Sequence, residues 1–206
     1  MSVRVKICGV TNAVDAALAV QYGADLIGLN FYPMSPRCID VETACAIRAA
    51  IPAHILCVGV FVNSERRQVL DCVEQIGLDL VQFHGDEEGE ALSGWPCATI
   101  KAVRIAPDGP PPDLAQIPTT YLLLDTYKAG RYGGTGEIFS WERMLPAIAP
   151  HAERVILAGG LSPENVVSAV RTVRPWAVDV ASGVEVTPRH KDPEKMRVFI
   201  TNAKTA

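Results

Sequence analysis

The sequence has no long apolar run, and no stretch approaches the roughly 20 apolar residues that a membrane-spanning helix needs. It also has little excess charge. Its 23 acidic and 19 basic residues leave a formal net charge of −4, which gives no attraction for nucleic acid or an anionic membrane. Near the N-terminus, Arg4 and Lys6 interrupt what would have to be the apolar core of a signal peptide. We therefore predict a cytoplasmic monomer or homodimer that acts on small molecules.

No Cys-x-x-Cys pair of the kind used for zinc or redox chemistry is present, although the chain has six cysteines. A chain of 206 residues is long enough to bury a core without disulfides. We therefore predict reduced thiols. Five of them fall within a strand, within helices or in connecting segments, and so do not end a strand: Cys57, Cys45, Cys72, Cys38 and Cys97.

Short apolar runs recur along the whole chain at intervals of roughly 20–30 residues, the length of one β–α unit. About eight of them are predicted to be strands, a number taken from the pattern of apolar runs and turn residues. They cover residues 3–8, 26–31, 56–62, 80–84, 99–103, 121–125, 155–159 and 178–182. Runs this apolar are typical of parallel strands that are covered on both faces.

Helix signals stand between most of these strands. Asn12 is placed to cap a helix that Gly23 ends. The tripeptides at 162–164 (Ser-Pro-Glu) and 192–194 (Asp-Pro-Glu) each supply a cap, a proline for the first helical position and a carboxylate near the positive helix end. Residues 106–112 are too rich in proline to begin a helix, so only a short turn at 113–117 is predicted before the sixth strand.

Regular alternation of strands and helices leaves two architectures, a closed (β/α)8 barrel and an open doubly wound sheet. Eight strands favour closure. The first strand is followed by Cys-Gly-Val-Thr at 8–11, which lacks the Gly-x-Gly-x-x-Gly loop that would favour the open sheet. We predict a single (β/α)8-barrel domain over residues 1–206, because the rhythm continues on both sides of the proline-rich segment.

The active site of such a barrel lies at the C-terminal ends of its strands. Two glycine-containing pairs, Gly159-Gly160 and Ser182-Gly183, follow the last two strands, where barrels commonly bind phosphate through backbone N–H groups. In the first strand Lys6 and Cys8 share one parity, so both are expected to point into the barrel if the alternating valines face the helices. The nearby ammonium would favour the thiolate form of Cys8. Asp125 ends an otherwise apolar strand, where a carboxylate is costly unless it is paired or functional.

Several motifs, in order along the chain, resemble the phosphoribosylanthranilate isomerase family. They are Lys-Ile-Cys-Gly at 6–9, Ser-Pro-Arg at 35–37, Gln-Phe-His-Gly at 82–85, Leu-Asp-Thr at 124–126, Gly-Gly-Thr-Gly at 133–136, Leu-Ala-Gly-Gly-Leu at 157–161, Asp-Val-Ala-Ser-Gly-Val-Glu at 179–185 and Lys-Asp at 191–192. Any one of these alone is a weak signal. Together they extend over nearly the whole chain.

The resemblance implies that Cys8 is the general base, that Asp125 is the general acid, and that Arg37 binds the carboxylate of an anthranilate group. Residues 133–136 are predicted to form a mobile loop over the site. The predicted substrate-binding set is Lys6, Arg37, His84, Gly159, Gly160, Ser182 and Gly183. The implied reaction, an Amadori rearrangement of a phosphosugar in tryptophan biosynthesis, consists of proton transfers and requires no cofactor or metal.

Two departures from the family pattern stand out. Ser140 occupies a position that is usually aspartate, and serine caps a helix equally well. Arg189 occupies a position that is usually glycine, which argues against a positive-φ turn in the eighth loop and could bring a cation there.

Two other functions stay open at this point. A metal-dependent pentose-phosphate epimerase would need several histidines and carboxylates at strand ends, and only His84 is available among the histidines. A non-catalytic phosphometabolite-binding barrel would have no use for a thiol and a carboxylate at its mouth.

Overall fold

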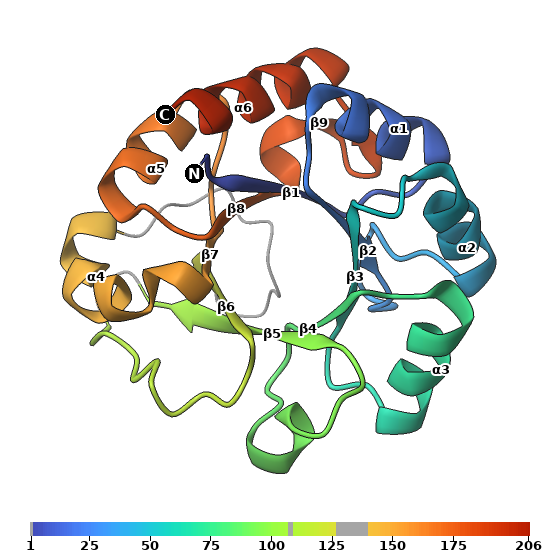
Figure 1. Ribbon diagram of the computed structural model, residues 1–206, viewed down its shortest axis with the longest axis horizontal. Helices are drawn as coiled ribbons and strands as arrows, with labels where there is room; N and C mark the ends of the chain where they lie inside the picture. The colour runs from blue at the N-terminus through green and yellow to red at the C-terminus, as the bar shows by residue number, and fades with distance from the viewer. Residues whose placement is uncertain (1, 107–108, 127–139) are drawn as a thin grey trace.

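A computed structural model describes residues 2–106, 109–126 and 140–206. Its centre is a closed barrel in which strands β1 to β8 pair in parallel in sequence order, and β8 pairs with β1. Figure 1 shows the strands around the middle and the helices around the rim. The predicted (β/α)8 barrel is confirmed, and the open doubly wound sheet is excluded.

Each barrel strand overlaps one predicted strand. The strands are β1 (Arg4–Cys8), β2 (Leu26–Asn30), β3 (Leu56–Phe61), β4 (Leu80–Phe83), β5 (Ala98–Ile105), β6 (Tyr121–Thr126), β7 (Val155–Leu157) and β8 (Ala177–Val180). The last two end two residues earlier than predicted, so Gly159 and Ser182 lie beyond the ends of the strands.

In the described parts of the chain, six α-helices pack outside the barrel: α1 (Ala13–Tyr22), α2 (Val41–Ala50), α3 (Arg66–Ile76), α4 (Trp141–Ile148), α5 (Val166–Val173) and α6 (Pro193–Thr205). The same parts contain three short 3₁₀ helices, which are η1 (Gly89–Leu92), η2 (Ala149–Arg154) and η3 (Ser182–Val184). The described residues between β5 and β6 form no helix, and Asp113 accepts a 3.1 Å hydrogen bond from the backbone of Ala115 in a turn there, as predicted.

Three of the predicted helix ends are confirmed. The Asn12 side chain accepts from the backbone N–H of Asp15 at the start of α1, and Gly23 ends that helix with φ 100°. The Asp192 side chain accepts from the N–H groups of Glu194 and Lys195 at the start of α6. These caps use N–H groups that have no partner within the helix.

The predicted cap at 162–164 is wrong. Helix α5 begins at Val166, and residues 163–165 form a turn before it. Asn165 organises this turn, because its side-chain oxygen accepts from the N–H of Ser162 at 2.9 Å and its amide nitrogen donates to the Gly160 carbonyl at 2.9 Å. The segment thus supports the glycine loop after β7 instead of extending the helix.

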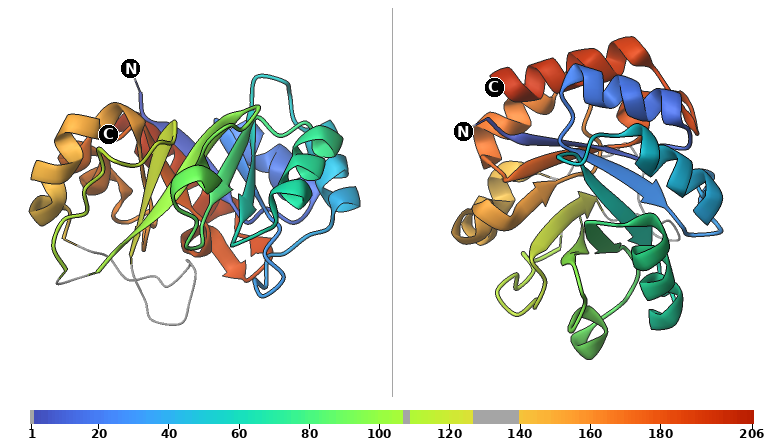
Figure 2. Two further views of the ribbon diagram at one scale, coloured as in Figure 1. Left: turned by 90° about the horizontal axis from the view of Figure 1, so that it is seen from below. Right: turned by 45° about the vertical axis from the view of Figure 1, so that its right-hand side comes forward.

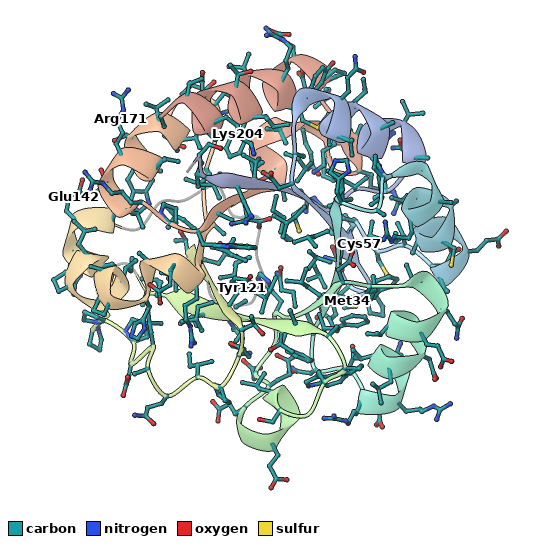
Figure 3. The ribbon with its side chains drawn as sticks, viewed as in Figure 1. Met34, Cys57, Tyr121, Glu142, Arg171 and Lys204 are labelled. Atoms are coloured by element: carbon teal, nitrogen blue, oxygen red, sulfur yellow. The ribbon has the colours of Figure 1, made fainter. Side chains whose placement is uncertain are left out.

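The core has two layers. One cluster fills the barrel: Leu26, Val58, Leu80, Ile100, Ala102, Leu123, Ile156, Ala158 and Ala177. The larger cluster lies between barrel and helices and includes Val5 and Ile7, which confirms the predicted parity of β1. Side chains fill the middle of the ring in Figure 3, whereas Glu142 and Arg171 lie at its rim. No helix in the described parts of the chain is long and apolar enough to cross a membrane.

A two-stranded hairpin, β9 (Glu185–Thr187) and β10 (His190–Lys191), follows η3 and was not predicted. It lies at the end of the barrel opposite to the N-terminus, where the strand arrows point (Figure 2). This is the end at which parallel barrels build their active sites.

Candidate active site

One pocket opens at the C-terminal ends of the strands and brings most of the predicted site residues together. Eight of the nine predicted residues line it: Cys8, Arg37, His84, Asp125, Gly159, Gly160, Ser182 and Gly183. The exception is Lys6. Residues 133–136, which we predicted to form a loop over the site, lie outside the described residues.

Lys6 lies below the pocket floor and not in its lining. Its side chain is fully buried, and its ammonium forms a 2.9 Å ion pair with Asp179 on β8, directly across from it in the strand register. Although burial lowers the pKa of Lys6, Asp179 and Cys8 outweigh that effect and raise it, so the residue stays charged. Lys6 is thus the one predicted site residue that the pocket lining lacks, and its ammonium lies beside Cys8 instead. Its contact with the substrate stays a prediction.

Cys8 ends β1, is partly exposed and lines the pocket. The predicted ammonium is close to it, but the net effect differs from our expectation. Burial raises the pKa of the thiol by more than Lys6 lowers it, and Asp179 adds to the increase. Cys8 is therefore a thiol at neutral pH, and its strongly basic thiolate is a minor form.

This pKa shift predicts a pH dependence. The thiolate of Cys8 forms only as pH rises toward and above the ordinary thiol range, so alkylation of Cys8 by iodoacetamide, which reacts with the thiolate, should be slow at pH 7 and should accelerate up to and beyond about pH 9. The measurement is the alkylation rate of the enzyme as a function of pH, with Cys8→Ala as the background from the other cysteines. A rate that has levelled off by pH 7.5 would contradict the raised pKa.

Asp125 lies near the end of β6 and is 5% exposed. One carboxylate oxygen accepts a 2.8 Å hydrogen bond from the Thr126 N–H, and the other lies 3.3 Å from Nε2 of His84. The Gln82 amide contacts Nδ1 of His84 at 2.8 Å and so fixes the ring, whose Nε2 faces Asp125. His84 is thus a wall of the pocket, as predicted, and it helps to place the carboxylate.

Gly159 makes this arrangement possible. Its φ of +76° lies in the left-handed region, and a side chain there would bring a Cβ within 2.6 Å of the Thr126 nitrogen and 3.0 Å of the Asp125 carboxylate. Any larger residue would push apart the loop and the end of β6. Gly160, with φ +67°, continues the same turn toward the next helix.

The second glycine loop packs directly on the first. A Cβ on Gly183 would collide with the carbonyl oxygen of Leu161, so the loops after β7 and β8 approach closely only because this residue is glycine. Gly183 lies in the single turn of η3, which starts at Ser182. Backbone from both loops therefore lines one side of the pocket, the arrangement predicted for a phosphate.

Arg37 lies on the rim of the pocket, but its guanidinium already has a partner. Its Nε and Nη2 donate to the two carboxylate oxygens of Glu185 at 2.8 and 2.6 Å. Gly9 leaves space for the arginine, since a Cβ there would overlap Arg37 Cδ. Sequence reasoning missed Glu185, although its place beside the eighth glycine loop was a usable signal.

Arg189 corrects a further expectation. It adopts φ +79° although it is not glycine. Its guanidinium donates to the carbonyl oxygens of Pro36 and Cys38 at 3.1 and 2.9 Å, and its own carbonyl accepts from the Thr11 hydroxyl at 2.9 Å. These bonds offset the strained backbone. They direct the arginine toward the second loop, not toward the glycine loops that we assign to phosphate.

All six cysteines are free thiols. Within the described parts of the chain, no three His, Cys, Asp or Glu side chains are grouped so that they could hold a metal ion. Among the described residues, the ends of β1 and β6 supply a thiol and a carboxylate to the pocket, and both groups suit proton transfer.

Comparison with known proteins agrees with this geometry. A family model described as N-(5'-phosphoribosyl)anthranilate (PRA) isomerase matches residues 5–202. The N-(5'-phosphoribosyl)anthranilate isomerase of Pseudomonas syringae pv. tomato is 46% identical over 207 residues, which cover 97% of each chain. The solved phosphoribosyl anthranilate isomerase of Thermus thermophilus is 38% identical, with a TM-score of 0.86 and 98% of both chains covered.

A further solved phosphoribosyl anthranilate isomerase is in complex with reduced 1-(o-carboxyphenylamino)-1-deoxyribulose 5-phosphate. It is 38% identical, its TM-score is 0.79, and the match covers 99% of this chain and all of that one. The resemblance inferred from the sequence motifs is confirmed over the full length of the barrel. The chain belongs to the N-(5'-phosphoribosyl)anthranilate isomerase family.

Proposed function

We propose that this chain converts N-(5'-phosphoribosyl)anthranilate to 1-(o-carboxyphenylamino)-1-deoxyribulose 5-phosphate, the Amadori rearrangement of tryptophan biosynthesis, as a cytoplasmic enzyme of one domain. The observation that carries this proposal is the single pocket in which Cys8, Asp125 and two glycine loops meet. A phosphosugar with an aromatic carboxylate is also the kind of molecule bound in the related complex. Whether the chain works as a monomer or a homodimer stays an open prediction.

In the proposed mechanism Asp125 is the general acid. It donates a proton to the furanose ring oxygen as the bond from that oxygen to C1 breaks, which leaves a protonated imine between C1 and the anthranilate nitrogen. Cys8, as the thiolate, then removes the proton from C2, and the electron pair of that bond forms an enolamine. Protonation at C1 and loss of the hydroxyl proton give the ketone, so the sequence is balanced by proton transfers alone.

The other pocket residues hold the substrate in this proposal. Backbone N–H groups of Gly160 and Gly183 bind the phosphate, since open glycine loops and a helix start present donors to an anion without a side-chain cation. Arg37 binds the anthranilate carboxylate, a task that suits its planar guanidinium. Lys6 holds Cys8 in place from below, and His84 orients Asp125.

A turnover assay tests the proposed function directly. Phosphoribosylanthranilate is generated in situ, because the compound is expected to be labile, and its fluorescence is followed after the enzyme is added. We expect rapid loss of the signal and formation of the ketose phosphate. No acceleration over the enzyme-free reaction would refute the proposal. The same assay with EDTA distinguishes the proposed isomerase from a metal-dependent phosphosugar epimerase. The isomerase should keep its activity, whereas the epimerase would lose it.

The phosphate site gives a prediction of its own. Gly183→Ala introduces the Cβ that collides with the Leu161 carbonyl, so the two glycine loops must move apart. We expect KM to rise by about tenfold or more, with a smaller change in kcat. The reason is that the phosphate is bound to the same extent in the substrate complex and in the transition state. Inorganic phosphate should also become a weaker competitive inhibitor.

The matched control is Gly77→Ala at the end of α3, where φ is +72° but a Cβ would meet nothing within 4 Å. This change strains the backbone without touching the site, so it should lower stability and leave KM unchanged. Equal values of the phosphate inhibition constant in wild type and Gly183→Ala would count against the assigned phosphate loops.

A further inference from the structure

The Arg37–Glu185 pair is a complete two-bond fork inside the site. The two side chains are 14% and 4% exposed, so water competes little for either partner. The bonds use Nε and Nη2, which form the side edge of the guanidinium. An arginine has five N–H donors, so the end edge formed by Nη1 and Nη2 can accommodate a second carboxylate.

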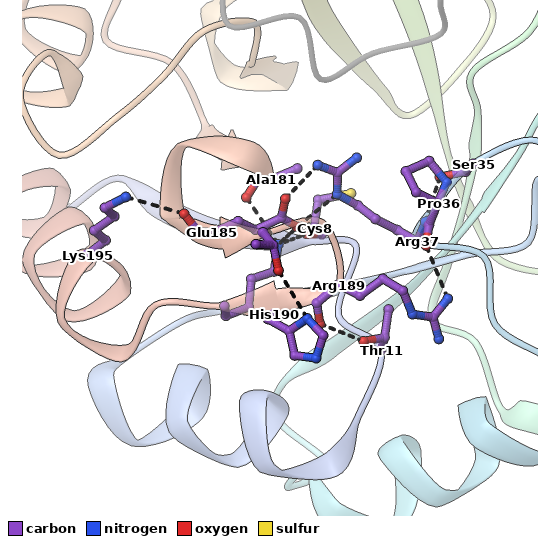
Figure 4. A network of polar contacts seen from close by, with 12 residues as sticks. Cys8, Thr11, Ser35, Pro36, Arg37, Ala181, Glu185, Arg189, His190 and Lys195 are labelled. Carbon is purple, nitrogen blue, oxygen red and sulfur yellow. Dashed lines mark hydrogen bonds and ion pairs between the residues drawn. The ribbon is translucent and has the colours of Figure 1, made fainter.

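Glu185 is itself held from the other side. Lys191 Nζ lies 3.0 Å from its Oε1 and also donates to the carbonyl oxygens of Cys8 and Ala181 at 2.6 and 3.1 Å. One buried ammonium therefore joins the end of β1, the loop after β8 and the carboxylate that grips Arg37. Figure 4 shows the contacts between Glu185, which begins β9, and the Arg37 guanidinium.

Electrostatics hold the two members of the fork in their charged forms. Burial raises the pKa of Glu185, but Arg37 and Lys191 outweigh it and hold that pKa below its ordinary value, so the group is ionised at neutral pH. The pKa of Arg37 is raised beside Glu185, so the guanidinium stays charged. Burial lowers the pKa of Lys191 in spite of its contact with Glu185, so the cation offered to a further carboxylate is the guanidinium of Arg37.

The same hairpin also fixes the backbone that carries Arg37. Arg189, between β9 and β10, donates to the carbonyls of Pro36 and Cys38, on both sides of that residue in the chain. The strained φ of Arg189 and these two bonds hold the loop at 36–38 against the hairpin. Both the main chain and the side chain of Arg37 are thus oriented from β9 and β10.

We propose that Glu185, anchored by Lys191, is a positioning residue that turns the Nη1–Nη2 edge of Arg37 toward the pocket and thereby sets the preference for a substrate with an aromatic carboxylate. This inference rests on the proposed function. It assigns the β9–β10 hairpin a task in substrate selection. Glu185 acts through Arg37 and takes no part in the proton transfers.

The test compares two stable ligands in wild type and Glu185→Gln by calorimetry. One is reduced 1-(o-carboxyphenylamino)-1-deoxyribulose 5-phosphate, and the other is the same compound made from aniline, which lacks the carboxylate. An amide cannot accept both arginine bonds, so we expect the Kd of the carboxylated ligand to rise by about tenfold. The Kd of the aniline compound and the inhibition by inorganic phosphate should stay within about twofold, and KM should change more than kcat.

Glu194→Gln is the matched control, because Glu194 makes the same two-bond fork with Arg197 on the exposed surface of α6. It should alter neither Kd. Glu185→Asp is the second variant; it keeps the charge that Lys191 needs but shortens the reach, so it should show the same selective loss even if Glu185→Gln folds poorly.

Three outcomes would overturn the inference: equal weakening of both ligands, no weakening of the carboxylated ligand in either folded variant, or tighter binding of it. Tighter binding would mean that Glu185 merely competes with the ligand carboxylate for Arg37. Failure of the proposed function would appear elsewhere, as a wild-type enzyme that does not turn over phosphoribosylanthranilate.

Discussion

Cys8→Ala is expected to lower kcat by a factor of about 10² to 10⁴, the usual contribution of one general base. Alanine fills part of the space of the thiol but cannot accept the C2 proton, and Lys6 with its Asp179 partner remains below it. Cys8→Ser should be nearly as poor, since a hydroxyl is a weak base at neutral pH. Steady-state fluorescence assays of each variant give kcat and KM separately.

The controls are two cysteines in helices, Cys45→Ala in α2 and Cys72→Ala in α3. Neither residue lines the pocket, so these substitutions should affect stability and leave kcat unchanged. A Cys8→Ala enzyme that kept more than about a tenth of the wild-type kcat would have lost less than a general base usually contributes. Cys8 would then not be the base.

Asp125→Asn is expected to lower kcat by a similar factor of about 10² to 10⁴ while KM changes little. The amide keeps the shape, and its oxygen can still accept from the Thr126 N–H, so the fold of the loop should be preserved. What is lost is the proton for the furanose ring oxygen.

Circular dichroism and a thermal melt of Asp125→Asn, beside its kinetics, separate catalysis from structure. A folded variant with a low kcat supports the acid assignment. A variant that unfolds, or a folded one with near-normal kcat, would instead indicate that the carboxylate serves to hold Thr126 and the loop that follows.

Much of the fold and site was predictable because the signals were local or periodic. Alternation in β1 separates Val5 and Ile7 from Lys6 and Cys8, and the barrel then places the second pair inside. Asp125 stood out as a carboxylate at the end of an apolar strand. Because all strands of the barrel are parallel, their C-terminal ends lie at the same end of it, which places Asp125 and Cys8 at one mouth.

What the sequence did not reveal depends on contacts between distant segments. Glu185 and Arg37 are 148 residues apart, and no local pattern pairs them. Gly28 is another example: it faces Cys8 across the β1–β2 register, and a Cβ there would lie 2.9 Å from the thiol and 3.0 Å from the Lys6 ammonium. A glycine within the apolar β2 strand was the available sign of this close approach.

The direction of the Cys8 pKa shift also lay beyond sequence reasoning. Parity correctly placed an ammonium beside the thiol, but it gave no measure of burial, which proves to be the larger influence. The helix-start tripeptide at 162–164 failed for a related reason. Asn165 donates a hydrogen bond to the Gly160 carbonyl and so holds this segment against the glycine loop after β7, and this tertiary contact overrides the local capping signal.

The fate of the hydrogen on ribosyl C2 tests the proposed chemistry most directly. Phosphoribosylanthranilate carrying deuterium at C2 is converted by the wild-type enzyme in ordinary water, and the product is analysed by mass spectrometry and proton NMR at C1. If a base removes the C2 proton and exchanges with solvent, part or all of the label should be lost from the product. Complete retention of deuterium at C1 would contradict the solvent-exchanging proton transfer that the account predicts for Cys8.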